Sequence, residues 1–206
     1  VRIGDYAFEN CTKLNAVYIS DLSSWCDIIF ETDHDWDEGY WEICNANPLK
    51  YAHDLYLNGE LIVDLVLPED VTSIGDYCFQ GASFRSVTLH EKISKIPNGA
   101  FSDCQASIIH IPHTVTTVGD YSFNGCDARI LTLTGVTSVG DWAFWSSSVQ
   151  IIYFGSVVPT EMSNEGNDYF KSKARKGYHC VTIDDIDYSS SGNTAAVIKC
   201  PEYLVG

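Results

Sequence analysis

Three-residue runs recur along this chain in which an aliphatic or aromatic residue stands on either side of a threonine, histidine or tyrosine. In an extended segment such a run places the flanking side chains on one face and the middle one on the other, the pattern of a half-buried β-strand. We therefore predict strands at Val17-Tyr18-Ile19, Val87-Thr88-Leu89, Ile109-His110-Ile111, Leu131-Thr132-Leu133 and Ile152-Tyr153-Phe154.

A second pattern precedes each of these runs. The hexapeptide Ile74-Gly75-Asp76-Tyr77-Cys78-Phe79 returns in related form at 3–8, 96–101, 118–123 and 139–144. The phenylalanines of the last four copies lie 22, 22 and 21 residues apart, a period that indicates a solenoid. Successive coils would stack their strands about 4.7 Å apart in a parallel sheet. Phenylalanine would fill the interior, and glycine would permit a turn geometry that other residues resist.

The segment that follows each hexapeptide, such as residues 100–104, is predicted to form a single helical turn. Residues 20–60 interrupt the period. There we expect a short helix capped by Asp21 and running toward Ile29, and a second helix that starts at Asn47-Pro48 and reaches His53. Residues 55–62 are predicted to form a hairpin whose turn is Asn58-Gly59.

The domain prediction follows from where the period stops. Residues 1–154 form the solenoid, with an irregular insertion at about 20–60. Residues 155–206 form a C-terminal cap or extension, with strands at 178–183 and 195–199, because an open solenoid end exposes core and strand edge. Val1 begins within a repeat, so we expect further repeats and an export signal upstream in the parent protein.

The repeat resembles a known family. The pattern Phe84-x-x-Val87-x-Leu89, followed by Ile93-x-x-Ile96 and Ala100-Phe101-x-x-Cys104, is similar to the BspA-type (Treponema pallidum-type) leucine-rich repeat, over 1–19 and about 61–154. This resemblance implies an α/β leucine-rich-repeat solenoid. It also implies a bacterial surface or secreted protein that acts in adhesion and protein–protein contact without catalysis.

Eight cysteines divide into two groups. Cys11, Cys104 and Cys126 each follow the repeat phenylalanine by three residues, in a slot that holds alanine or serine in other copies, so we predict buried free thiols there. Cys26 with Cys44, and Cys180 with Cys200, lie outside the regular repeats and are candidate disulfide pairs. The chain has no CxxC motif of the kind that binds zinc.

Charge narrows the range of partners. Twelve Lys and Arg against 28 Asp and Glu give a net charge of −16, which disfavours nucleic acid and anionic lipid. No apolar run is long enough to span a membrane. The hydrolase elbow, P-loop, Rossmann and zinc-protease motifs are also missing from the sequence, so we predict no enzymatic activity and no cofactor.

Two clusters of side chains, one acidic and one of histidines, are candidates for a metal site. The acidic stretch 31–38 lacks the glycine and terminal glutamate of a calcium loop. His90, His110 and His113 fall near one another on neighbouring rungs, and we interpret them as surface histidines rather than a zinc site. No metal is predicted.

The strand face is the predicted binding surface. Stacking exposes one mid-strand residue per rung on the concave side of the solenoid, namely Tyr18, Val66, Thr88, His110, Thr132 and Tyr153. Trp36, Tyr40 and Trp41, in the loop 31–45, are a second candidate contact. The expected partner is a protein, such as a host extracellular or matrix protein, met outside the cell or at its surface. Carbohydrate binding through the loop aromatics, and a structural spacer that displays another domain, are the alternatives.

Overall fold

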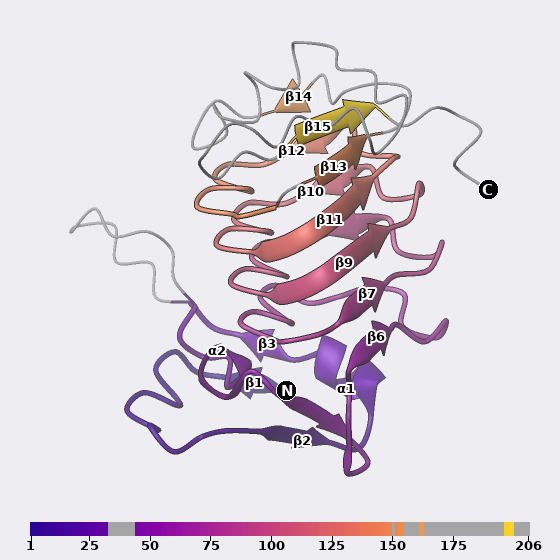
Figure 1. The fold of residues 1–206 in the computed structure, drawn as a ribbon. Helices are drawn as coiled ribbons and strands as arrows, with labels where there is room; N and C mark the ends of the chain where they lie inside the picture. Colours follow the sequence, from indigo (N-terminus) through magenta and orange to yellow (C-terminus); the bar gives the residue numbers. More distant parts are fainter. Residues whose placement is uncertain (33–43, 150, 155–160, 163–195, 200–206) are drawn as a thin grey trace.

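Stacked coils of chain make up the molecule, as the sequence predicts (Figure 1). The computed structural model describes residues 1–32, 44–149, 151–154, 161–162 and 196–199. Six strands form the main parallel sheet, in the order β15-β13-β11-β9-β7-β6. Their bounds are β6 Asp64–Val66, β7 Ser86–Thr88, β9 Gln105–Ile111, β11 Asp127–Leu133, β13 Ile151–Phe154 and β15 Ala196–Lys199.

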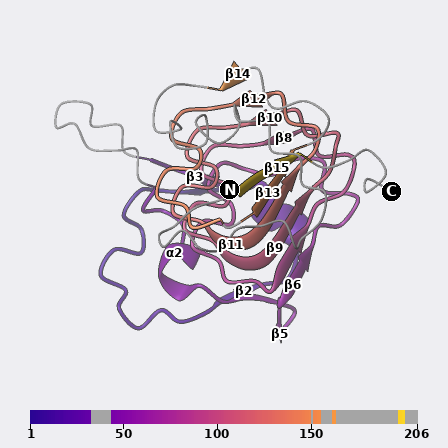
Figure 2. The ribbon, with the colours of Figure 1, turned by 45° about the horizontal axis from the view of Figure 1, so that its top comes forward.

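A second, narrower sheet lies across the interior from β9 and β11 (Figure 2). Its strands are two residues long and also pair in parallel from coil to coil. They are β8 Lys95–Ile96, β10 Thr117–Val118, β12 Ser138–Val139 and β14 Glu161–Met162. The strands β7, β9 and β11 of the main sheet are each followed by a strand of the narrow sheet, and the two sheets line opposite sides of the core. The predicted solenoid architecture is confirmed.

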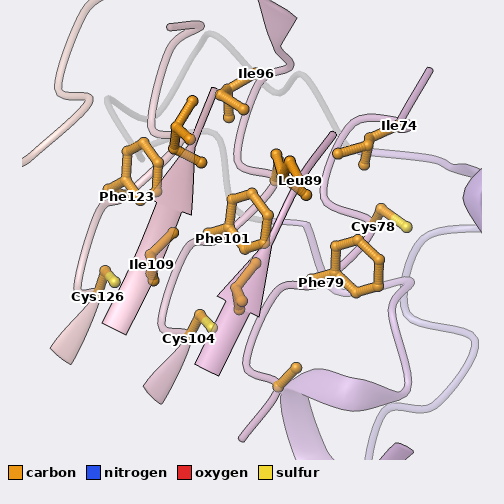
Figure 3. Packing of buried hydrophobic residues seen from close by; sticks show 14 of the residues in the cluster. Ile74, Cys78, Phe79, Leu89, Ile96, Phe101, Cys104, Ile109, Phe123 and Cys126 are labelled. Atoms are coloured by element: carbon orange, nitrogen blue, oxygen red, sulfur yellow. The ribbon is translucent and has the colours of Figure 1, made fainter. Parts of the chain in front are cut away.

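Phenylalanine rings form a continuous column between the two sheets (Figure 3). The centroids of Phe79 and Phe101 lie 5.6 Å apart, those of Phe101 and Phe123 5.7 Å, and those of Phe123 and Phe144 5.5 Å. The interplanar angles are 17°, 8° and 3°, and the first three rings are fully buried. Such ring pairs add about 0.5–1.5 kcal/mol each beyond the area they bury. The predicted role of phenylalanine as the interior filler is confirmed.

The predicted helical turn after each hexapeptide is wrong. The backbone N–H groups of Tyr77, Phe79 and Gly81 donate to carbonyls of the next coil at 2.8–2.9 Å. The N–H groups between them close local turns three residues back, such as Gln80 to Tyr77 at 3.0 Å. Tyr77 and Gly81 have φ of 58° and 74°, a left-handed conformation that interrupts any helix. This segment therefore forms a third row of backbone hydrogen bonds between neighbouring coils, beside those of the two sheets.

The glycine at the second position of the hexapeptide does not have the predicted role. The left-handed residue lies two positions later and is Tyr6, Tyr77, Gly99, Tyr121 or Trp142, whereas the second-position glycine allows close approach between coils. A Cβ on Gly119 would lie 2.9 Å from the backbone nitrogen of Asn98, and one on Gly75 would lie 2.9 Å from the carbonyl oxygen of Cys26. Because the coils approach so closely here, Oδ1 of Asn98 can accept from the N–H of Asp120 at 3.0 Å.

The irregular N-terminal region follows its predicted local signals. Oδ2 of Asp21 accepts from the N–H of Ser24 at 2.8 Å and caps a helix that is shorter than predicted. The second helix begins one residue later than predicted, with Pro48 rather than Asn47 at its N-cap, and His53 ends it; Oδ1 of Asn47 accepts from the N–H of Leu49 at 2.9 Å. The hairpin turn at Asn58-Gly59 is confirmed. The elements are β1 Arg2–Ile3, β2 Val17–Ile19, α1 Leu22–Cys26, β3 Ile29–Phe30, α2 Leu49–Ala52, β4 Leu55–Leu57 and β5 Glu60–Leu61.

The cysteine predictions are partly corrected. Cys104 and Cys126 are buried free thiols, and burial raises the pKa of Cys104 to about 12. Cys11 occupies the same slot but is exposed, because no described coil covers the outer side of the first one. The predicted pairing of Cys26 with Cys44 is wrong, because the sulfur of Cys26 contacts that of Cys78, whereas the sulfur of Cys44 contacts the carbonyl oxygen of Glu31. Cys180 and Cys200 lie outside the described residues.

The C-terminal segment extends both sheets within its described part. β14 pairs with β12, and β15 pairs with β13. The predicted strand at 195–199 is thereby confirmed, while the one at 178–183 lies outside the described residues. The boundary at 154 and the capping role stay predictions.

Gly119→Ala should destabilise the solenoid by about 1–3 kcal/mol, because its new methyl group meets backbone of the preceding coil. Gly4→Ala is the matched control, since Gly4 holds the same hexapeptide position and its Cβ would meet nothing closer than 3.7 Å. Urea unfolding followed by circular dichroism measures both. Equal midpoints for the two variants would contradict the close-approach role.

Candidate binding face

The predicted row of mid-strand residues exists on the main sheet. Backbone register places Val66 beside Thr88, Thr88 beside His110, and His110 beside Thr132. Tyr153 follows Thr132 in the same register. Val66 is 65% exposed, and Thr88 and His110 are exposed as well. Thr132 is half-buried, so the row from Val66 to Thr132 is an outward-facing surface that crosses the four strands β6, β7, β9 and β11.

The residues beside this row hold it in place. Leu65, Val87, Ile109 and Leu131 precede the row residues and are fully buried in the core. Because successive side chains of a strand point to opposite faces, burial of these four keeps the row turned outward. The register on which the binding prediction depends is thus fixed by the core.

Tyr18 does not belong to this row. It lies on β2 in a separate sheet of order β2-β4-β5, which the hairpin ends before β6 begins. Tyr18 is 68% exposed, and its ring stacks on that of Tyr56 with centroids 4.7 Å apart and an interplanar angle of 23°. Tyr56 belongs to the predicted hairpin and is not among the predicted site residues.

His110 is linked to Thr132 across the two longest strands. Nδ1 of His110 lies 2.9 Å from Oγ1 of Thr132, and that oxygen also accepts from the N–H of Ile111 at 3.2 Å. The hydroxyl hydrogen of Thr132 is therefore free to donate to Nδ1. In the neutral imidazole this leaves Nε2 as the ring donor that is available to a ligand.

The other two histidines each have partners of their own. Nε2 of His90 lies 2.8 Å from the carbonyl oxygen of Pro68, and its Nδ1 accepts from the N–H of Lys92. Nδ1 of His113 lies 3.2 Å from a carboxylate oxygen of Glu91. Within the described ranges, no group of three or more histidine, cysteine or carboxylate side chains is placed to hold a metal ion.

A shallow hollow of about 430 Å³ lies beside the row, where β9 and β11 begin. Arg85, Ser107 and Arg129 contribute to it from three consecutive coils, with the N–H of Ser107 donating to the carbonyl of Arg85 at 3.0 Å. The alternating runs 109–111 and 131–133 do not predict this hollow, because β9 and β11 begin four residues before them. The full lining is Leu61, Ile62, Val63, Ser83, Phe84, Arg85, Gln105, Ala106, Ser107, Asp127 and Arg129.

An ion pair stands at the edge of the hollow. Nε of Arg85 donates to Oδ1 of Asp64 at 2.9 Å, a second guanidinium nitrogen contacts Oδ2, and Oγ of Ser86 donates to Oδ1 at 2.7 Å. The bonds from Arg85, and then the one from Ser86, lower the pKa of Asp64 to about 2. A two-point contact of this kind fixes the orientation of the guanidinium plane.

The second predicted binding site lies in the loop 31–45. Trp36, Tyr40 and Trp41 lie outside the described residues. The two ends of the loop meet, since Sγ of Cys44 lies 3.9 Å from the carbonyl oxygen of Glu31. Asn45 is tied to the first coil through its N–H, which donates to Oδ1 of Asp5 at 3.1 Å. The loop 31–45 therefore departs from and returns to one point of the solenoid.

Comparison with known proteins also identifies this chain as a leucine-rich-repeat protein. The family model described as the BspA type leucine rich repeat region matches six copies, over residues 1–33 and 53–174. No significant match is found among curated proteins or solved structures. The chain belongs to the BspA-type leucine-rich-repeat family. It is a repeat module of the kind that generally mediates protein interactions, and the described part of the chain contains no helix long and apolar enough to cross a membrane.

Asp64 should titrate with a midpoint near 2, against 3.8 for an ordinary aspartate. Because folding lowers its pKa, this carboxylate stabilises the fold above about pH 4 and loses that contribution as the pH falls toward 2. Arg85→Gln should return the midpoint toward 3.8. Carboxyl ¹³C shifts followed by NMR measure both values. An unchanged midpoint in the variant would show that Arg85 does not hold Asp64.

Proposed function

We propose that this chain is a non-catalytic adhesion module at the cell surface or in the secreted fraction, and that it binds a protein partner through the exposed face of the main sheet. The observation that carries the proposal is the row Val66, Thr88, His110 and Thr132, in register above a fully packed core. Stacked repeats commonly use such extended faces for binding.

The chemistry around the row suits recognition of a protein surface. Val66 and Ile108 offer exposed apolar area, at 65% and 44% exposure. Arg85 and Arg129 line the hollow beside the row, and arginine is enriched among residues that dominate interface energies. The net charge of −16 favours a partner whose own contact surface is neutral or basic.

Two triple variants test whether the exposed face of the main sheet binds the partner. Each introduces three glutamates, so both change the net charge equally. Val66→Glu, Thr88→Glu and His110→Glu together should weaken partner capture at least tenfold, because the native contacts are lost and three carboxylates must be desolvated at the interface centre. The matched control is Ser94→Glu, Thr116→Glu and Thr137→Glu, three exposed residues of consecutive coils outside the main sheet.

The assay is capture of proteins from extracellular-matrix and mucosal extracts by immobilised wild type and both variants. Equal thermal melting of the three proteins is required before comparison. Capture that both variants retain would reject the strand face and direct attention to the loop with Trp36, Tyr40 and Trp41. Loss of capture after enzymatic deglycosylation of the extract would instead support a carbohydrate ligand. Capture by none of the three proteins would favour the structural spacer.

A further inference from the structure

Two buried thiols meet where α1 packs against the first regular coil. Cys26 is the last residue of α1, and Cys78 directly precedes Phe79 in the hexapeptide. Their sulfur atoms lie 3.8 Å apart, with exposures of 2% and 0%. Among the cysteines that the structure describes, this is the one pair whose sulfurs are in contact.

The position of Cys78 is unusual within the repeat. The same hexapeptide position holds Ala7, Ala100, Ser122 and Ala143 in the other copies. Cysteine therefore occurs there only in the coil that faces α1. Cys104 and Cys126 differ, because they recur in a small-residue slot and have no sulfur neighbour of this kind.

Backbone contacts fix the two segments on both sides of the pair. The N–H of Gly75 donates to the carbonyl of Cys26 at 2.9 Å. Nε1 of Trp25, the neighbour of Cys26, donates to the carbonyl of Cys78 at 3.1 Å. These hydrogen bonds hold the two thiols against each other, and a disulfide would shorten the distance between their sulfur atoms from 3.8 Å to about 2.05 Å.

We propose that Cys26 and Cys78 form a disulfide that joins the irregular N-terminal region to the regular solenoid. The oxidant is a small-molecule disulfide such as glutathione disulfide. One cysteine thiolate attacks it, which forms a mixed disulfide and releases one thiolate. The second cysteine thiolate then attacks the protein sulfur of the mixed disulfide and releases the other. The protein pair loses two electrons, and its two protons pass to the released thiolates.

Burial determines when this reaction occurs. Burial and the contact with Cys26 raise the pKa of Cys78 well above its usual range, so the folded thiol is a poor nucleophile. The bond therefore closes while the N-terminal region folds, and afterwards it is shielded from reductants. It closes a loop of about 50 residues, which constrains the unfolded chain strongly. This inference does not depend on the proposed function.

Peptide mapping of refolded protein is the direct test. The full chain is refolded with reduced and oxidised glutathione, denatured, blocked with N-ethylmaleimide and digested after Lys, Arg and Glu. Cleavage at Glu31 separates Cys26 from Cys44, and cleavage at Lys50 separates both from Cys78. Mass spectrometry should find a linked peptide pair that contains Cys26 and Cys78. Blocked thiols at both positions, or a link from Cys26 to Cys44, would overturn the proposal.

Thermal melting of matched variants gives the second readout. Oxidised wild type should melt about 5–10 °C above the reduced protein. Cys78→Ala should abolish that difference and still fold, because alanine holds this position in other coils. Cys104→Ala, at a buried thiol without a sulfur partner, should keep the difference. Loss of the difference in Cys104→Ala but not in Cys78→Ala would also refute the pair.

Discussion

Hydrogen bonding between successive coils is the constraint on which this structure depends. The chain pairs with its neighbour in the main sheet, in the narrow sheet and again in the turn segment that contains Tyr77 and Phe79. Each bond contributes only about 0.5–1.5 kcal/mol net. Buried backbone groups must nonetheless be paired, so the coils are held at one separation all around their circumference.

That separation explains the composition of the hexapeptide. Glycine is required where a methyl group would meet the backbone of the adjacent coil, as at Gly119. The aspartate or asparagine beside it bonds to the N–H of the next coil, as Asn98 does to Asp120. Phenylalanine rings then stack at 5.5–5.7 Å along the interior. The residue types of the hexapeptide therefore reflect the distance between neighbouring coils.

The N-terminal region keeps the same contacts with different residues. Asn47 is fully buried, and its Nδ2 donates to the carbonyls of Tyr77 and Cys78 at 2.6 and 3.1 Å. Trp25 adds the indole bond to Cys78. A helix end and two side chains thus satisfy backbone groups of the first regular coil that another coil would otherwise pair. The stacking constraint therefore holds even where the repeat is lost.

Sequence alone determined the solenoid, its period, the stacked strands and the row from Val66 to Thr132, because a repeated alternation has only one arrangement that buries every apolar position. Local signals at Asp21, Asn47 and Asn58-Gly59 likewise predicted the caps and the hairpin. Tertiary structure alone decided that Tyr18 stacks on Tyr56 in a separate sheet, that Cys11 is exposed, and that Cys26 meets Cys78 rather than Cys44. These outcomes depend on how the irregular N-terminal region packs against the regular coils. The repeat pattern does not predict that packing.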